Sequence, residues 1–103
     1  QNFFPQSSAK GAQVFCAPNG EESRALGTLV REKLISRVDP DNHRELKEGT
    51  RDVLLLYKTR RPAVLVECGF LSNPEEAEFL VVNEYQEEIT ESICSGILKW
   101  LDK

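Results

Sequence analysis

A carboxylate at the end of an apolar run is the clearest candidate for chemistry in this sequence. In "PAVLVECGFLSNPEE", residues 62–76, the apolar run Ala63–Val66 is followed directly by Glu67. Such a run predicts a short strand that is buried on both faces. Ligands of open α/β sheets gather beyond the carboxyl ends of the strands, so Glu67 is placed where a general acid or base is needed. The alternative is that Glu67 only marks where the strand meets water, and spacing alone does not separate the two interpretations.

Other residues that could bind a metal or act as nucleophiles are few. The three cysteines, Cys16, Cys68 and Cys94, are widely spaced and odd in number. They predict buried, reduced thiols rather than a disulfide framework or a zinc module. The single histidine, His43, lies in the polar stretch "DNHRELKEG" and is interpreted as a solvated residue. The chain by itself is therefore expected to bind no zinc.

The composition excludes several classes of function. The 103 residues are 40% apolar and 29% charged, as in ordinary globular proteins, and they correspond to one domain at most. The net charge is −4 and only Lys58, Arg60 and Arg61 form a basic cluster, so no nucleic-acid-binding surface is expected. No apolar run is long enough to cross a bilayer and no basic-then-apolar leader is present, so the sequence predicts neither a membrane span nor a signal peptide.

The elements upstream of Glu67 are predicted to be a strand and a long helix. "GAQVF", Gly11–Phe15, alternates enough to form a short strand. Asn19 can cap a helix, and Glu22 stands three residues later as in a capping box. The helix is expected to end before Pro40, because proline disfavours helical geometry in the preceding residue. The apolar residues at helical spacing are Ala25, Leu26, Leu29, Val30, Leu34, Ile35 and Val38.

A second apolar run and two further helices complete the predicted elements. "DVLLLY", Asp52–Tyr57, is interpreted as another strand buried on both faces. After Glu67, Asn73 as N-cap and Pro74 at the first helical position predict a helix start. A final helix is expected from Asn83. Its apolar stripe comprises Tyr85, Ile89, Ile93 and Ile97, with Cys94, Leu98 and Leu101 beside them.

These elements predict an α/β fold in which helices cover both faces of a sheet. A chain of this length supplies few neighbours for continuous apolar strands, so it has the character of half of a larger α/β domain. The isolated chain is therefore expected to expose a large apolar surface and to self-associate, swap segments or stay loosely packed.

The stretch "PAVLVECGFLSNPEEAEFL" resembles the C-terminal half of the zinc-dependent N-acetylmuramoyl-L-alanine amidases, which cut peptidoglycan. "KGAQVF" upstream and "NEYQEEITESICSGILKWL" downstream extend the resemblance over nearly all of residues 1–103, with the sporulation and germination amidases of Gram-positive bacteria the most similar subgroup. The resemblance implies the C-terminal half of a three-layer α/β domain, with a mixed, mostly parallel sheet flanked by helices. It also implies an extracytoplasmic location, in the cell wall or spore cortex.

The resemblance also implies roles for individual residues. Glu67 matches the glutamate of the family's V-E-x-G-F stretch, the catalytic acid/base beside a zinc ion that two histidines and a glutamate hold. The bond cut would be the amide between the lactyl group of muramic acid and L-alanine. Gly69 would shape the turn that presents Glu67. Asn2, Gly69 and Arg60 are the candidate substrate-binding residues, with Arg44 and Arg61 as further basic side chains that could meet the anionic peptide stem.

The family's zinc ligands belong to its N-terminal half, and the third lies in an H-x-N stretch that would place a histidine directly before Gln1. The chain is therefore expected to carry the catalytic glutamate without the metal site and to be inactive alone. An activating protein is a candidate partner of the enzyme. One rival interpretation is a non-catalytic, amidase-like binding or regulatory module for peptidoglycan or a partner protein. Another is an unrelated α/β domain with a coincidental strand-end acid.

Overall fold

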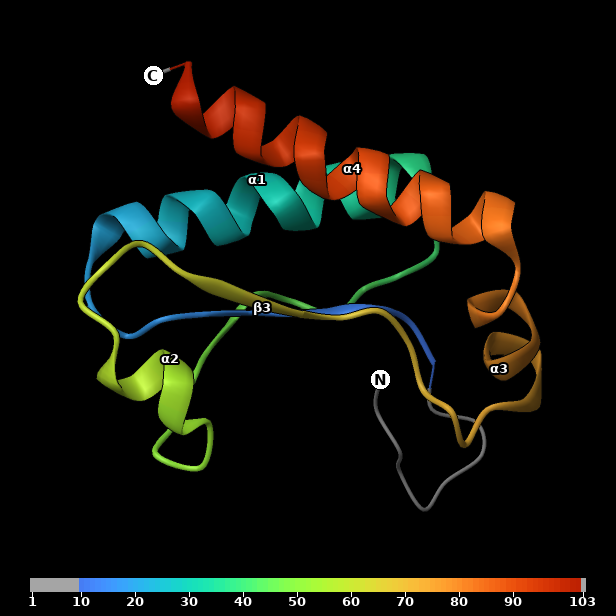
Figure 1. The fold of residues 1–103 in the computed structure, drawn as a ribbon, viewed down its shortest axis with the longest axis horizontal. Helices are drawn as coiled ribbons and strands as arrows, with labels where there is room; N and C mark the ends of the chain where they lie inside the picture. The colour runs from blue at the N-terminus through green and yellow to red at the C-terminus, as the bar shows by residue number, and fades with distance from the viewer. Residues whose placement is uncertain (1–9, 103) are drawn as a thin grey trace.

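The computed structural model describes residues 10–102, in which a small sheet is packed against helices (Figure 1). Asn2 and the rest of the segment before Lys10 lie outside the described residues. In chain order the elements are β1 (Gln13–Cys16), α1 (Glu21–Arg37), β2 (Lys47–Glu48), α2 (Leu54–Lys58), β3 (Val64–Glu67), α3 (Pro74–Leu80) and α4 (Asn83–Leu101).

The sheet is mixed, as predicted, with strand order β2-β1-β3. β1 pairs in parallel with β2 over two residue pairs and antiparallel with β3 over four, so the parallel pairing is the shorter of the two. The register places Gln13 opposite Glu67 and Phe15 opposite Leu65. β3 begins one residue later than the apolar run suggested and includes Glu67 as its last residue.

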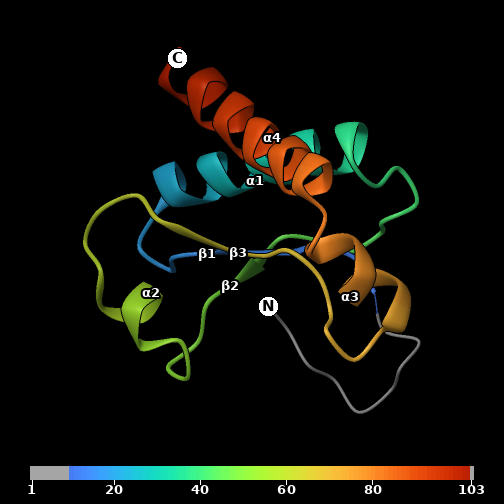
Figure 2. The same cartoon turned by 45° about the vertical axis from the view of Figure 1, so that its right-hand side comes forward.

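The two long helices, α1 and α4, lie side by side over one face of the sheet (Figures 1 and 2). Val14 of β1 is buried beneath them, and Val64 and Val66 of β3 pack against the same core. The helices approach closely at Gly96, where an added Cβ would lie 2.8 Å from the Cα atom of Val30. The buried core comprises Val14, Leu26, Val30, Leu34, Leu80 and Ile89.

The opposite face of the sheet is more open than the sequence predicted. Side chains alternate along a strand, so Leu65 and Glu67 point away from the core that Val64 and Val66 join. Leu65 is 36% exposed, which contradicts burial of β3 on both faces. Figure 1 shows the reason, since the long helices lie together on one side of the sheet, whereas the helices toward its other side, α2 and α3, are short. This half-covered face carries Glu67.

The prediction of a strand at Asp52–Tyr57 is wrong, because most of this segment belongs to helix α2, which begins at Leu54. The helical turn is visible in the bond from Tyr57 N to Val53 O, 2.9 Å. Leu56 is buried while Leu54 and Leu55 are 59% and 85% exposed. Short apolar runs do not distinguish a strand from a helix, and leucine favours helices.

The cap predicted at Asn19 is also wrong. Helix α1 begins at Glu21 with Gly20 at the N-cap position and no side-chain cap hydrogen bond. The Asn19 side chain instead donates from Nδ2 to the carbonyl oxygens of Thr59 and Arg61, at 3.1 and 2.8 Å. It thereby ties the start of α1 to the loop before β3. The predicted end of this helix is confirmed, since α1 finishes at Arg37.

The last two helices begin where the sequence predicted. Asn73 caps α3, its Oδ1 accepting from the backbone N–H groups of Glu75 and Glu76 at 3.0 and 3.2 Å. Helix α4 begins at Asn83, but its buried stripe is narrower than expected. Ile89, Ser92 and Gly96 are buried on α4, whereas four residues of the predicted stripe are exposed: Cys94, Ile97, Leu98 and Leu101.

Exposed apolar side chains are spread over several elements. Besides those on α2 and α4, they include Leu71, Phe79, Val81 and Val82 around α3. This agrees with the expected apolar surface, while self-association itself stays a prediction. Among residues 10–102, no helix combines the length and the hydropathy that crossing a membrane requires.

Candidate functional site

The site is built where β3 ends beside the start of β1. Glu67 is half-buried at the carboxyl end of β3, on the open face of the sheet. Its cross-strand neighbour is Gln13, the glutamine of the "GAQ" stretch. Directly opposed residues of antiparallel strands share a face, so these two side chains leave the sheet on the same side. A carboxylate that is partly shielded yet open to one side can exchange protons with a bound ligand.

Gln13 is an unusual neighbour for a candidate acid, because one of its polar atoms is buried without a partner. The residue is 3% exposed. Its Nε2 donates to the backbone oxygen of Glu45 at 2.7 Å and to that of Val14 at 3.2 Å. Within the described residues its Oε1 accepts no hydrogen bond. Buried acceptors are almost always paired, so this atom has room for a partner beyond the described residues, such as a water molecule. From the sequence, Gln13 was predicted only to be part of a strand.

The turn that follows Glu67 is held by a hydrogen bond to a carboxylate of α3. The Oε1 atom of Glu76 accepts from Phe70 N at 2.9 Å, and its Oε2 accepts from Gly11 N at 2.7 Å. Gly69 is buried against this carboxylate, since an added Cβ would lie 3.1 Å from Glu76 Oε1. Little room for a side chain is left at Gly69, and its roles in presenting Glu67 and in contacting substrate stay predictions.

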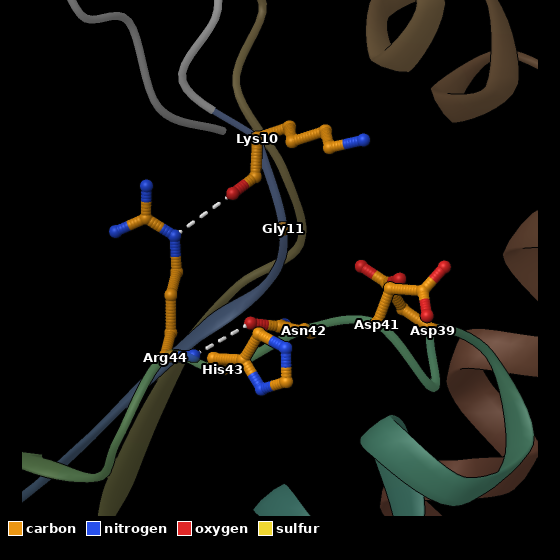
Figure 3. Close-up of a pocket in the computed structure, with 7 residues that line it drawn as sticks. All are labelled: Lys10, Gly11, Asp39, Asp41, Asn42, His43 and Arg44. Atoms are coloured by element: carbon orange, nitrogen blue, oxygen red, sulfur yellow. Dashed lines mark hydrogen bonds between the residues drawn. The ribbon is translucent and has the colours of Figure 1, made fainter.

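An open cleft of about 420 Å³ lies near this end of β1 (Figure 3). Figure 3 shows the Asp39 and Asp41 carboxylates on one side of it and the Arg44 guanidinium on the other. Arg44 is tied down, because its Nε donates to Lys10 O at 2.9 Å. His43 lines the cleft as an exposed side chain, as the sequence analysis expected. The cleft presents both signs of charge, which suits a zwitterionic or mixed-charge group.

Arg44 also supports the turn after Glu67. Its Cζ atom lies 4.6 Å from the centroid of the Phe70 ring, in a cation–π contact. The neighbouring Asn42 donates from Nδ2 to Ala12 O at 2.9 Å and accepts from Arg44 N at 2.9 Å. The segment before β1 is therefore held by Asn42 and Arg44 as well as by the α3 carboxylate.

The structure separates the other predicted residues from this site. Arg60 lies in the loop before β3, next to the start of α1, whereas Glu67 closes the strand at its other end. The structure therefore does not bring Arg60 and Glu67 together, and Arg60 as a substrate contact stays a prediction. Residues 10–102 contain no group of three or more histidine, cysteine, aspartate or glutamate side chains that could hold a metal ion. The part of the chain that the structure describes thus does not fit a catalytic zinc site by itself.

The cysteines occupy three different environments. Cys16 is buried, and burial raises the pKa of its thiol. Cys68 is partly buried and Cys94 is exposed on α4, which corrects the expectation that all three are buried. The three cysteines, all within residues 10–102, form no disulfide bond. Cys94 is exposed because it lies off the narrow buried stripe of its helix.

Tyr85 lies on the core side of the turn, lining a second cleft together with Lys10 and Glu76. Burial raises the pKa of Tyr85, and the carboxylates of Glu76 and Asp39 raise it further. Both effects disfavour the phenolate, so the side chain is held neutral.

A family model described as N-acetylmuramoyl-L-alanine amidase matches residues 1–99. The germination-specific N-acetylmuramoyl-L-alanine amidase of Bacillus subtilis (strain 168) is 30% identical over 99 residues, covering 96% of this chain and 41% of that protein.

Solved structures show the same similarity. The CwlD amidase from Clostridioides difficile, in complex with the GerS lipoprotein, has a TM-score of 0.93 and 42% identity, covering 98% of this chain and 51% of that one. The N-acetylmuramoyl-L-alanine amidase AmiC2 of Nostoc punctiforme has a TM-score of 0.84 and 28% identity, covering 99% and 54%. The chain therefore spans about half the length of these structures.

Proposed function

Because the chain belongs to the N-acetylmuramoyl-L-alanine amidase family, we propose that it contributes the general acid/base to hydrolysis of the amide between N-acetylmuramic acid and L-alanine in peptidoglycan. The observation that carries the proposal is Glu67 at the end of β3, half-buried on the open face of the sheet. Family membership excludes the alternative of an unrelated α/β domain.

In this proposal Glu67 moves a proton twice. It first accepts a proton from the attacking water, whose oxygen adds to the scissile carbonyl carbon. It then gives that proton to the amine of L-alanine as the carbon–nitrogen bond breaks. The Gly69 turn keeps the carboxylate at the strand end, and the mixed-charge cleft of Figure 3 offers both signs of charge to the peptide stem.

Zinc enters only as an expectation from the family resemblance. Since the described residues contain no ligand set, the ion would be held by residues outside them, and we assign no step of the reaction to it here. The isolated chain of 103 residues is accordingly expected to retain no stoichiometric zinc and to be inactive. Metal analysis after dialysis tests this, and zinc bound through His43 and a cysteine would contradict it.

The place of action and a partner are proposed by analogy. The relatives named above support action outside the cytoplasm, in the cell wall or the spore cortex, with germination as the context. The CwlD structure contains a lipoprotein, which supports a partner protein for the complete enzyme here as well. The exposed leucines of α2 offer an apolar surface for such a contact.

Glu67→Gln in the complete enzyme tests the proposed function. The amide keeps the shape of the side chain but cannot take a proton, so turnover should fall by about 100- to 10,000-fold. The free energy of unfolding should change by no more than about 0.5 kcal/mol. The measurement is release of L-alanine amino termini from purified peptidoglycan, with zinc content and thermal midpoint checked alongside.

Glu87→Gln is the matched control, because Glu87 is exposed on α4 and away from β3. It should leave turnover unchanged. Near-normal turnover in a folded, zinc-loaded Glu67→Gln enzyme would remove Glu67 from the reaction. A wild-type enzyme that binds peptidoglycan without cleaving it would favour the rival interpretation, a non-catalytic binding or regulatory module.

A further inference from the structure

The hydrogen-bond ladder between β1 and β3 ends at Glu67. Ala17 N donates to Ala63 O at 2.9 Å, just outside the first residue pair of these strands. In an antiparallel pair, hydrogen-bonded residue pairs recur at every second position. Counting along the register from Ala17 and Ala63 makes Gln13 and Glu67 such a pair, and they are the last one observed.

One more pair would follow if the ladder continued. Two residues further along each strand, the register would set Gly11 opposite Gly69, with Gly11 N–H donating to the carbonyl of Gly69. Gly11 N donates instead to Glu76 Oε2 at 2.7 Å. The other oxygen of the same carboxylate accepts from Phe70 N at 2.9 Å. The Glu76 carboxylate therefore replaces the next rung and bridges the two chain segments where they diverge.

The local backbone leaves room for this carboxylate. A Cβ on Gly69 would lie 3.1 Å from Glu76 Oε1, so any larger residue there would press on the bridge. Gly11 has a φ of +97°, a conformation that other residues rarely adopt. Each of the two bridged segments thus has a glycine next to the carboxylate, Gly11 in one and Gly69 in the other.

Glu76 is available for the bridge because α3 is capped without it. A glutamate at the third helical position usually bonds back to the N–H of the N-cap residue. Here the N–H of the cap, Asn73, donates to Phe70 O at 3.1 Å instead. The Glu76 side chain consequently reaches beyond its own helix to Gly11, 65 residues away in the sequence. Hydrogen bonds to a carboxylate are stronger than those between neutral groups.

We propose that Glu76 is a positioning residue for Glu67, holding the strand-end turn and the segment before β1 in the geometry that the reaction needs. This inference rests on the proposed function. Glu67 belongs to the last hydrogen-bonded pair of the ladder. The bridge lies three residues later in the chain, at Phe70. Without the bridge, the contacts of Arg44 with Lys10 and Phe70 still join the turn to the segment before β1, but the two backbone N–H groups lose their shared acceptor. The direction of the Glu67 carboxylate is then less firmly fixed.

Glu76→Gln in the complete enzyme tests the proposal, with Glu75→Gln as the matched control. The amide keeps the size of Glu76 but presents an NH₂ group to one of the two N–H donors. Misplacement of a catalytic group by about 1 Å can cost about 100-fold, so kcat should fall by about 10- to 100-fold. KM should change less than kcat, since no side chain that is proposed to meet the substrate is replaced. Glu75 is exposed and adjacent in the same helical turn, and its variant should match the wild type in both constants.

Amide hydrogen exchange gives a readout that does not depend on activity. In Glu76→Gln the amides of Gly11 and Phe70 should exchange faster, while that of Val30 in the core stays protected. Unchanged exchange at both amides would overturn the bridge. Faster exchange with a kcat within about twofold of wild type would reduce Glu76 to a structural role and overturn the proposal.

Gly69→Ala provides a second route if Glu76→Gln does not fold, because it keeps the carboxylate and displaces it. Its kcat should also fall, and the double variant should be no worse than the poorer single variant, since both act on one bridge. A folded Gly69→Ala enzyme with faster exchange at Gly11 and normal kcat would contradict the proposal. The Glu67→Gln enzyme distinguishes failure of the proposed function from failure of the positioning role. If Glu67→Gln turns over normally, the proposed function fails. If Glu67→Gln is inactive while Glu76→Gln is fully active, only the positioning role is overturned.

Discussion

The two faces of the sheet differ in how they are covered. On one face, Val14, Val64 and Val66 pack beneath α1 and α4. The side chain of Val30, on α1, is fully buried there. On the other face, Leu65 is 36% exposed and Glu67 is half-buried. Both faces are built from the same short strands, with alternate residues contributing to each.

This difference separates stability from chemistry. Burial of apolar area stabilises the fold, and the main buried cluster lies on the helix-covered face. The open face leaves a carboxylate accessible at a strand end, which burial beneath a helix would prevent. Substitutions on the covered face should therefore change the free energy of unfolding, and substitutions at Glu67 should change the rate.

The largest effect on stability is expected from Leu34→Ala on the covered face. Leu34 is 4% exposed in the core of α1, so truncation should leave a cavity and cost about 2–5 kcal/mol. Leu55→Ala on α2 is the comparison, because Leu55 is 85% exposed and its loss should cost at most about 0.5 kcal/mol. Denaturant unfolding of both variants measures the contrast. Equal costs would show that α2 is covered in solution and would break the distinction between the faces.

Gly96→Ala sharpens the same comparison at the contact of the two helices. The added methyl group would lie 2.8 Å from the Cα atom of Val30, which is backbone and cannot rotate away. Overpacking of this kind typically costs about 1–3 kcal/mol, although alanine favours helices. Thermal unfolding measures the change. A stabilised Gly96→Ala variant would show that α1 and α4 pack less closely than described.

The smallest effect is expected from Tyr85→Phe, and it appears only at alkaline pH. The pKa of Tyr85 is raised above its ordinary value of 10.0 by burial and by the Glu76 and Asp39 carboxylates. Above pH 10.0 the unfolded chain loses this proton while the folded chain keeps it, so folding stability falls as pH rises towards the folded pKa. Well below pH 10.0 both the folded and the unfolded chain keep the proton, and Tyr85 then contributes no pH dependence to stability. Phenylalanine has no such proton.

The measurement is the free energy of unfolding from neutral pH to above pH 10.0 for wild type and Tyr85→Phe. The variant should lose less stability on the alkaline side and show the wild-type slope near neutrality. Identical slopes throughout would mean that Tyr85 is solvated in the folded protein.

Sequence patterns predicted the elements whose signals are local. Asn73 and Pro74 specify the start of α3, because capping depends on residues within one turn. The position of Glu67 at the end of β3 was also predicted, because the apolar run directly before it is a local signal. The patterns failed at Asp52–Tyr57, where an apolar run without clear periodicity allowed both a strand and a helix. They also failed at Asn19, whose side chain found tertiary partners instead of capping its own helix.

The site shows the same division. The resemblance pointed to Glu67 and Gly69, since these residues form one continuous motif, whereas Gln13 and Glu76 were not assigned to it. Within residues 10–102 the Oε1 atom of Gln13 accepts no hydrogen bond. The surroundings of this side chain and the bond from Gly11 to Glu76 depend on segments that are distant in the chain. A sequence pattern contains no information on such distances.

The sequence by itself thus determined which residue stands at the end of the apolar strand and where the last two helices begin. The tertiary structure decided which face of that strand is open, because this depends on both long helices packing on the same side (Figure 2). It also decided that a glutamate of α3 closes the ladder between β1 and β3. Local signals act over a few residues along the chain, whereas coverage and cross-strand bonds arise only when distant segments meet.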